Sequence, residues 1–449
     1  MKPHLTYRLA VGAELEHADV PPWTHLISAS SFPGSGHPAV DAVFARHGRD
    51  VLIAAEYEPA SAASWSQEER ASGLHRVYRA VATSDTPFPT ALIDDLQAVD
   101  VVAGAERGRV AAVPLGGSGD RHGPGRGASA WAHEMIGVPE AHRLTQGDEQ
   151  IVIAVLDTGL DLQHPEVVDR LEPGRDFVDI LDGADEFLGD SVGADDTADD
   201  PGVGHGTHVA GIIAGGGRAM PRGVVPACRI LPVRVLGALR RGERVIGAGL
   251  VDNINGGIKW AVDRGASVIN MSLGIRHEGG GLPHAEVVNY ARRRGVVVVA
   301  AAGNDGTQQL YYPGSLPGVV AVGAVDQAGD VASFSTWGDQ VDLVAPGVDI
   351  YSSFLNGGYA FSSGTSQAAP FVAGATALLR SASLAEGVVL SERQVQHLLT
   401  STADRLDHRF KHPKAGFGLI NLPDALRLLH HRLATPPAAH SERRLLGAA

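Results

Sequence analysis

The chain has 449 residues, of which 44% are hydrophobic and 56 are glycine, a composition that fits a packed α/β protein and excludes a disordered one. Its formal net charge is −14, and no basic stripe offsets it, which argues against a nucleic-acid partner. The single cysteine, Cys228, excludes an intramolecular disulfide and is expected in the core. Because no signal segment begins the chain and no window is long enough to span a membrane, we expect a cytoplasmic location by default, with export by another route left open.

The first 115 residues predict a small α+β domain without a catalytic motif. Strand-like runs occupy residues 51–55, 77–81 and 110–113, and a short helix is predicted over residues 89–98. Residues 116–129 include six glycines within the twelve positions 116–127, too many to hold secondary structure, so they predict a flexible linker and a cleavage region.

Three motifs beyond the linker carry polar side chains suited to catalysis. The apolar run 151–156 predicts a buried parallel strand that ends at Asp157, and His205 lies among glycines just before a predicted helix. Ser366 lies in a Gly-Thr-Ser turn that opens directly into an alanine-rich helix. A serine hydroxyl is a poor nucleophile unless a base takes its proton and a third group orients that base. The order Asp, His, Ser supplies these three roles.

An acidic stretch separates the first two motifs. Residues 176–200 hold ten Asp or Glu and no Lys or Arg. Their carboxylates are the hard oxygen ligands that calcium prefers, although their spacing is not that of an EF-hand loop. A solvated surface loop is the alternative, so the metal content is left unknown.

Strands and helices then alternate as in a parallel sheet with right-handed crossovers. Strands are predicted over residues 230–236, 267–271 and 296–304, with helices over 250–264 and 283–294. A further amphipathic helix is predicted over residues 391–404. Residues 429–449 are rich in proline and alanine and predict a disordered tail.

The sequences around Asp157, His205, Asn304 and Ser366 resemble those of the subtilisin family (subtilase) of serine proteases, from about Gln150 to Leu422. The resemblance implies a three-layer α/β catalytic domain over residues 130–428, with Asp157, His205 and Ser366 as the catalytic triad. It also implies that the Asn304 amide donates to the oxyanion. Two positions depart from the family pattern: Gln367 replaces the usual Met and Phe371 a common His, and we expect altered packing rather than lost activity.

The family pairs an extended peptide with two chain segments and encloses the residue before the cut bond in a pocket. The residues of this chain that match these places are Gly247, Gly249, Ser272, Leu273, Gly274, Ala302, Gly303 and Tyr311. We expect Tyr311 to make the pocket shallow and Asp305 at its rim to tolerate a basic residue. Many members also carry an inhibitory N-terminal propeptide, a role that residues 1–115 fit; a distinct regulatory or partner-binding domain is the alternative.

The sequence therefore predicts a serine endopeptidase that acts through an acyl-enzyme on a peptide or protein substrate and processes itself near residues 115–130. No cofactor is required for this chemistry, and structural calcium is left open. One alternative is a dedicated maturation protease for one partner peptide, and another is a catalytically silent peptide-binding module. An aspartic protease would need a second copy of the Asp157 motif, and a zinc site at His205 and His208 lacks a third ligand.

Overall fold

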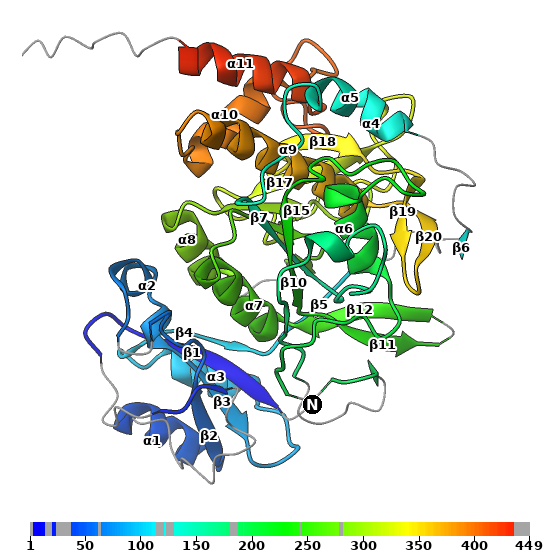
Figure 1. Cartoon of the computed structure of the whole chain (residues 1–449). Helices are drawn as coiled ribbons and strands as arrows, with labels where there is room; N and C mark the ends of the chain where they lie inside the picture. The colour runs from blue at the N-terminus through cyan, green and yellow to red at the C-terminus, as the bar shows by residue number, and fades with distance from the viewer. Residues whose placement is uncertain are drawn as a thin grey trace, which may run out of the picture.

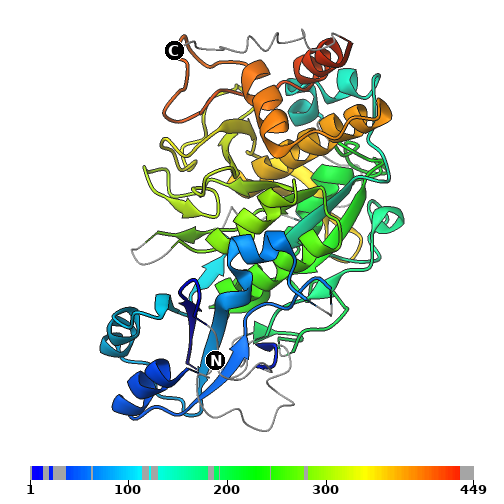
Figure 2. The same cartoon turned by 90° about the vertical axis from the view of Figure 1, so that its left-hand side faces the viewer.

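The chain forms a small N-terminal domain and a larger α/β domain (Figure 1). The structure is a computed structural model that describes residues 3–13, 20–23, 37–61, 64–113, 121–122, 130–179, 187–191, 193–242, 244–277 and 282–434. The N-terminal domain and the last helices lie at opposite ends of the molecule in both views (Figures 1 and 2).

A seven-stranded parallel sheet is the frame of the larger domain. Its strands, in spatial order, are β18 (Leu343–Pro346), β17 (Val320–Val325), β15 (Val297–Ala301), β13 (Val268–Met271), β7 (Val152–Asp157), β10 (Arg229–Arg234) and β8 (Arg175–Asp176). Side chains alternate between its faces: Ile153 and Val155 join one hydrophobic core, Ala154 and Leu156 the other. Both faces are covered, which explains the uninterrupted apolar runs in the sequence.

Helices cover both faces of this sheet and complete three layers, as predicted. The helices are α4 (Trp131–Met135), α5 (Val138–Ala141), α6 (His205–Ala214), α7 (Val251–Asp263), α8 (Ala285–Arg293), α9 (Thr365–Ala385), α10 (Glu392–Thr402) and α11 (Leu422–Ala434). Residues of α7 and α8 pack in one core, and residues of α6, α9, α10 and α11 pack in the other.

Helix α9 runs through the second core. It has 21 residues, rich in alanine, and its small side chains let it lie close to α6 and to strands β15 and β17. It is the one described helix long and apolar enough to cross a membrane, but 83% of its apolar window is buried inside the protein. Its composition therefore matches its place in the core.

The N-terminal domain has its own sheet and core. Its elements are β1 (His4–Leu9), α1 (Pro38–Arg46), β2 (Val51–Ala55), α2 (Gln67–Ser72), the 3₁₀ turn η2 (Leu74–Arg76), β3 (Val77–Ala82), α3 (Thr90–Gln97) and β4 (Val102–Arg107). The four strands pair antiparallel in the order β2-β3-β1-β4, and α1 and α3 supply Phe44 and Leu92 to the core. The predicted strands at 51–55 and 77–81 and the helix at 89–98 are confirmed.

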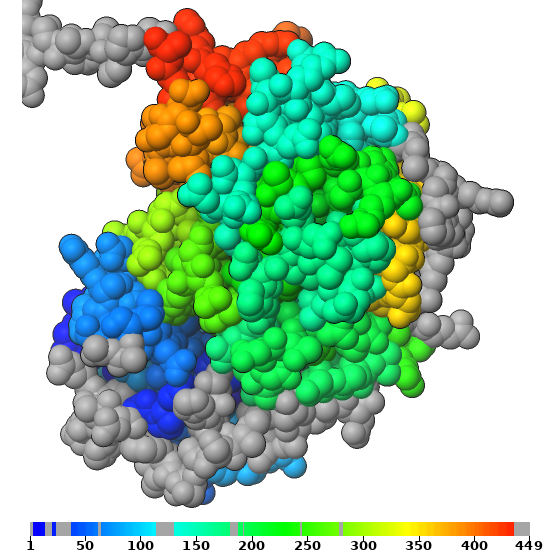
Figure 3. Space-filling model, in the orientation of Figure 1, coloured from blue at the N-terminus to red at the C-terminus, as the bar shows by residue number. Residues whose placement is uncertain are grey.

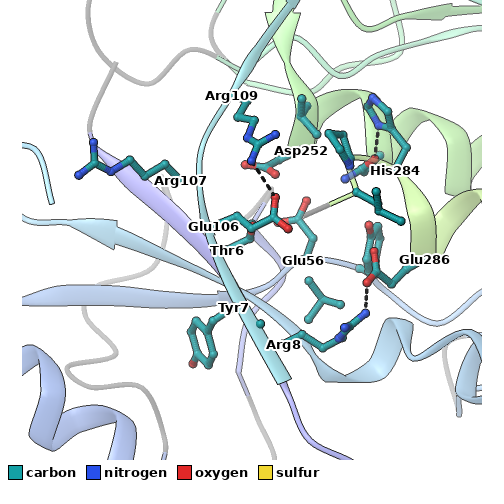
Figure 4. Close-up of a pocket in the computed structure, with 17 residues that line it drawn as sticks. Thr6, Tyr7, Arg8, Glu56, Glu106, Arg107, Arg109, Asp252, His284 and Glu286 are labelled. Atoms are coloured by element: carbon teal, nitrogen blue, oxygen red, sulfur yellow. Dashed lines mark hydrogen bonds and ion pairs between the residues drawn. The ribbon is translucent and has the colours of Figure 1, made fainter. Parts of the chain in front are cut away.

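Ion pairs join the N-terminal domain to α7 and α8, beside which it lies in Figure 3. His4 Nε2 lies 2.9 Å from Asp252 Oδ2, and Glu69 lies 2.8 Å from Lys259 Nζ, all four side chains being buried. Figure 4 shows a cavity of about 90 Å³ at this seam, where Arg8 of β1 pairs with Glu286 of α8. The two parts are therefore held by specific charges as well as by shared apolar contacts.

Smaller sheets complete the fold. They contain β5 (Val110–Ala112), β12 (Arg244–Leu250), β11 (Gly237–Arg241) and β9 (Phe187–Leu188); β14 (Ile275–Arg276) and β16 (Tyr311–Tyr312); and β19 (Ile350–Phe354), β20 (Gly358–Ser362) and β6 (Arg121–His122). A further 3₁₀ turn, η3, spans Val168–Arg170. The first of these sheets joins the end of the N-terminal domain to the larger domain.

The structure differs from the sequence-based prediction at the start of the tail and at two residues inside the linker. The predicted disordered tail begins too early, because α11 continues to Ala434 and buries Leu429 against the core. Within the predicted linker, Arg121 and His122 pair with β20, since backbone groups form a ladder whatever the side-chain composition. The rest of both segments, residues 116–120, 123–129 and 435–449, lies outside the described residues.

Candidate active site

Asp157 and His205, far apart in sequence, are in direct contact. Asp157 ends β7, is fully buried, and its Oδ1 lies 2.7 Å from His205 Nδ1. A carboxylate oxygen only accepts, so Nδ1 carries the hydrogen and Nε2 keeps its lone pair. Nε2 is buried and has no hydrogen-bond partner among the described residues. The imidazole is therefore oriented on one side and available as a base on the other.

The start of α6 fixes the position of His205. Gly206 follows it, and a Cβ on that residue would lie 2.1 Å from the Gly159 carbonyl oxygen, so only glycine permits this approach to the Asp157 loop. The neighbouring His208 is buried against the carbonyls of β19 and β20; burial, with a smaller effect of His205, lowers its pKa to about 4. His208 therefore stays neutral and serves packing.

The carboxylate of Asp200 connects the two loops that carry Asp157 and His205, a role that the sequence analysis missed. Its oxygens accept hydrogen bonds from the Thr158 hydroxyl at 2.6 Å and from the backbone N–H groups of Gly202, Val203 and Gly204 at 2.7 to 2.9 Å. Burial raises the pKa of this carboxyl despite these donors. Only its place as one of ten acidic residues in positions 176–200 was visible in the sequence, which gave no signal of this role.

Ser366 lies in the first turn of α9, at the positive end of the helix. Its hydroxyl donates to the Ser272 carbonyl at 2.9 Å, and the Ser272 hydroxyl donates to the Ser366 carbonyl at 2.7 Å. The structure thus ties Ser366 to the predicted substrate segment that follows β13, while its hydroxyl is not bonded to His205.

Asn304 lies beside this turn. Its Oδ1 accepts the Thr365 backbone N–H and the Thr365 hydroxyl, both at 2.9 Å. Its Nδ2 is buried and has no acceptor among the residues that the structure describes. The side chain is therefore held by its oxygen, with its amide hydrogens available to an added negative charge.

The end of the N-terminal domain occupies the predicted peptide-binding segments. Strand β5 pairs antiparallel with β12, with Ala111 opposite Gly249, and the Val113 N–H donates to the Gly247 carbonyl at 2.9 Å. On its other side, Ala112 forms a bridge with Gly274. Residues 110–113 therefore lie as an added strand between two segments that were predicted to hold substrate.

Tyr311 lies over the predicted pocket. A Cβ on Gly303 would lie 2.6 Å from its ring, and one on Gly274 would lie 3.2 Å away. Its hydroxyl donates to Asp305 at 2.9 Å, and Arg276 lies 4.0 Å from the same carboxylate. The charge of Asp305 is therefore already compensated, which weakens the expectation that it receives a basic substrate residue.

The remaining predicted site residues, Leu273 and Ala302, have buried side chains. Leu273 is fully buried in the same hydrophobic cluster as Ala111 and Val113, and Ala302 is also buried. The Ala302 N–H donates to the Val322 carbonyl at 3.0 Å, and this hydrogen bond fixes the backbone that leads into Gly303. Phe371, which replaces a histidine common in the family, packs edge-on against His133, and the two ring centroids are 5.2 Å apart.

The acidic stretch does not form a metal site in its described part. Asp176 pairs with Arg234, and Asp179 and Asp195 accept backbone N–H groups. No cluster of three or more metal-ligating side chains occurs among the described residues. The loop that follows α6 is held by the Glu166 carboxylate, which accepts hydrogen bonds from the backbone N–H groups of residues 217–219. The described carboxylates are thus engaged by protein donors, and structural calcium stays a prediction.

Comparisons with known proteins identify the family of this chain. A profile of the Subtilase family matches residues 148–419. A thermophilic serine proteinase of Bacillus sp. (strain AK1) is 40% identical over 285 residues, 63% of each chain. Subtilisin Savinase of Lederbergia lenta is 37% identical over 298 residues, 66% of this chain and 98% of Savinase. The structure of the prenylagaramide maturation protease PagA is similar, with a TM-score of 0.54 and 31% identity over 65% of this chain and 98% of PagA. The chain belongs to the subtilase family, the subtilisin-like class of serine endopeptidases.

Proposed function

We propose that the chain hydrolyses peptide bonds through an acyl-enzyme on Ser366, with His205 as the base and Asp157 as the group that orients it. The contact between Asp157 and His205, which leaves Nε2 with a free lone pair, is the observation that carries this proposal. In the reaction the Ser366 hydroxyl turns from the Ser272 carbonyl to Nε2. His205 takes its proton as Ser366 attacks the substrate carbonyl, then returns it to the departing amine.

In the same proposal Asn304 stabilises the negative oxygen of the tetrahedral intermediate. Its buried Nδ2 has two hydrogens to donate, while its oxygen is fixed by Thr365. Such a preorganised donor stabilises charge that develops during the reaction, without reorganisation of solvent. The first N–H groups of α9 lie beside Ser366 and favour the same charge.

The N-terminal domain is proposed as a propeptide that is removed by self-processing. Strand β5 already lies along β12 and Gly274 in the manner of a bound peptide, which supports this assignment. The glycine-rich residues 116–129 follow it within a few residues in the sequence, and such a composition is typical of cleaved segments.

Expression of the full chain beside its Ser366→Ala variant tests the triad and the processing together. We expect N-terminal sequencing to find a new terminus between residues 115 and 130 in the wild type only. A fluorophosphonate probe should label the wild type and not the variant. Equal cleavage of both proteins would contradict self-processing, and a processed wild type that fails to label would favour a silent peptide-binding module.

A dedicated maturation protease for one partner peptide is the second candidate function. The similarity to a maturation protease and the Tyr311 ring against Gly303 favour a narrow substrate range. A peptide-library profile separates the two functions: a general endopeptidase cuts many sequences, whereas a dedicated one cuts few and leaves casein intact.

A further inference from the structure

Residues 405–414, which we name the basic loop, carry charge opposite to that of the whole chain. They contain Arg405, Arg409, Lys411 and Lys414 and one carboxylate, Asp407, in a chain of net charge −14. Asp407 pairs with Arg409 at 3.5 Å. Arg405 and Lys414 are exposed, and neither pairs with a carboxylate among the described residues. The positive charges of Arg405 and Lys414 are therefore accessible to an anionic partner.

An exposed aromatic ring lies in the middle of this loop. Phe410 is 72% exposed, yet it is held in place by Phe417, whose ring centroid lies 5.5 Å away, and by Arg405. A fixed aromatic ring with a rim of cations is typical of protein-binding surfaces, where aromatic and arginine side chains contribute most of the affinity.

A cavity continues the surface beside the loop. It measures about 270 Å³ and lies between α10 and the β17–β18 edge of the sheet; its lining residues include Val320, Leu343, Leu399, Phe417, Asp342 and Arg393. We name it the α10 cavity. Phe417 belongs both to its wall and to the support of Phe410, and Lys411 lies 3.7 Å from Asp342. Arg393, 83% exposed, lies at the margin, 4.0 Å from the Glu392 carboxylate.

Contacts lead from this surface to the candidate active site. Lys414 lies 5.8 Å from the ring of Trp337, and Trp337 Nε1 donates to the Gly306 carbonyl at 3.3 Å. Gly306 is two residues after Asn304. The loop, drawn in orange in Figure 2, lies at the end of the molecule away from the N-terminal domain, so that domain leaves it uncovered.

We propose that the basic loop and the α10 cavity together dock an acidic segment of the protein that this enzyme cuts, with one apolar side chain of that segment in the cavity. Carboxylates of the segment would pair with Arg405 and Lys414, and with Arg393 in competition with Glu392. A membrane surface fits less well, because carboxylates such as Asp342 and Asp407 lie among the cations and would repel anionic headgroups. The assignment of the segment to a substrate rests on the proposed protease function; the docking itself does not.

Fluorescence anisotropy with the full-length Ser366→Ala protein tests the docking. The probe is a labelled peptide of Glu and Asp with one central Phe, compared with a Gln/Asn version and with a version in which Ser replaces Phe. We expect the acidic Phe peptide to bind about tenfold more tightly than either, with affinity that falls as salt rises. The Arg405→Glu/Lys414→Glu double variant should weaken it about tenfold or more.

The Arg46→Glu/Arg218→Glu double variant is the matched control, because it makes the same change of net charge at exposed positions elsewhere. Equal binding of the acidic and amide peptides would overturn the proposal, as would equal weakening by both double variants. So would binding to phosphatidylserine vesicles without binding to the peptide, or self-association that Arg405→Glu/Lys414→Glu abolishes in the absence of peptide binding.

A second measurement connects docking to cleavage. The wild type is given a short cleavable peptide and the same peptide extended by the acidic Phe segment. The Arg405→Glu/Lys414→Glu variant should lower kcat/KM for the extended peptide about tenfold and leave the short one unchanged. A loss that is equal for both peptides would contradict recruitment. Absence of turnover of either peptide by the processed wild type would instead count against the proposed protease function, while the anisotropy result still decides the docking.

Discussion

At the scale of single residues, the candidate site depends on carboxylates and amides that are held by their own hydrogen bonds. Asp157 uses one oxygen to orient His205, whose Nε2 stays without a partner among the described residues. Asn304 uses its oxygen to bind Thr365, and its amide nitrogen likewise has no acceptor there. Asp200 forms no hydrogen bond with His205 or Ser366 in the described part of the chain. It does accept hydrogen bonds from Thr158 and Gly204, which are adjacent in sequence to Asp157 and His205. It is therefore a positioning residue.

Replacement of Asp200 by alanine should lower kcat about 10- to 100-fold with little change in KM, because the imidazole loses its fixed approach to Asp157. The buried donors left without acceptors should also destabilise the fold by about 2 to 4 kcal/mol. Steady-state kinetics well below the unfolding temperature separate the two effects, and Asp200→Asn, which keeps one acceptor oxygen, should recover part of kcat. A lower Tm with unchanged kcat would show that the role is structural only.

Replacement of Tyr311 by alanine should deepen the pocket beside Gly303. We expect the ratio of kcat/KM for peptides with Phe before the cut bond to those with Ala there to rise about tenfold or more, since the ring vacates space for a large apolar side chain. Tyr311→Phe, which removes only the hydrogen bond to Asp305, is the control. An unchanged ratio in Tyr311→Ala would place the ring outside the pocket.

At the scale of elements, the packing of α4 against α9 contains a buried polar ring. Both nitrogens of His133 lack a hydrogen-bond partner among the described residues, and the ring rests on Phe371. Burial, with a smaller effect of His142, lowers the pKa of His133 to about 4. The ring is thus neutral in the folded protein, whereas in the unfolded chain it binds a proton below about pH 6.5.

The stability that depends on neutral His133 is therefore complete above about pH 6.5 and is lost as the pH falls toward 4, by up to about 3 kcal/mol. His133→Leu should reduce the fall in the free energy of unfolding between pH 7 and pH 4.5. It should not abolish that fall, because His208 and His284 are buried with similarly lowered pKa values of about 4. Urea unfolding in the Ser366→Ala background measures this, with exposed His430→Leu as control. An identical pH slope in His133→Leu would contradict it.

At the scale of the whole molecule, the N-terminal domain is bound in two ways. Ion pairs such as Glu69 with Lys259 hold its body on α7 and α8, and β5 extends into the candidate substrate groove. The two attachments are joined by one continuous chain, so the body keeps the strand at high effective concentration near the groove.

A charge introduced into β5 should release the strand without unfolding the N-terminal domain. Ala111 is fully buried between the two parts, so Ala111→Asp places an unpaired carboxylate there. We expect fluorophosphonate to label Ser366 in the unprocessed fraction of this variant about tenfold faster than in the unprocessed fraction of the wild type, because the groove is then less often occupied. Val110→Asp, at an exposed neighbouring position, is the control. Equal labelling rates in Ala111→Asp and wild type would show that β5 does not limit access.

The sequence alone determined the chemistry-bearing residues and the architecture. Asp157, His205, Asn304 and Ser366 lie in local motifs, and continuous apolar strands between amphipathic helices are enough to predict a parallel sheet covered on both faces. The motifs and the covered sheet can be predicted from the sequence because a motif and the periodicity of a strand or helix each involve residues that are close together in the chain.

Only the tertiary structure decided which distant groups meet. The link from Thr158 to Gly204 through Asp200, the insertion of residues 110–113 beside Gly247, and the junction of the basic loop with the α10 cavity all depend on backbone register and long-range packing. Asp200 resembles its acidic neighbours in sequence, and its role follows from where the surrounding N–H groups point after folding. A one-dimensional pattern gives the residue types available, while the fold selects their partners.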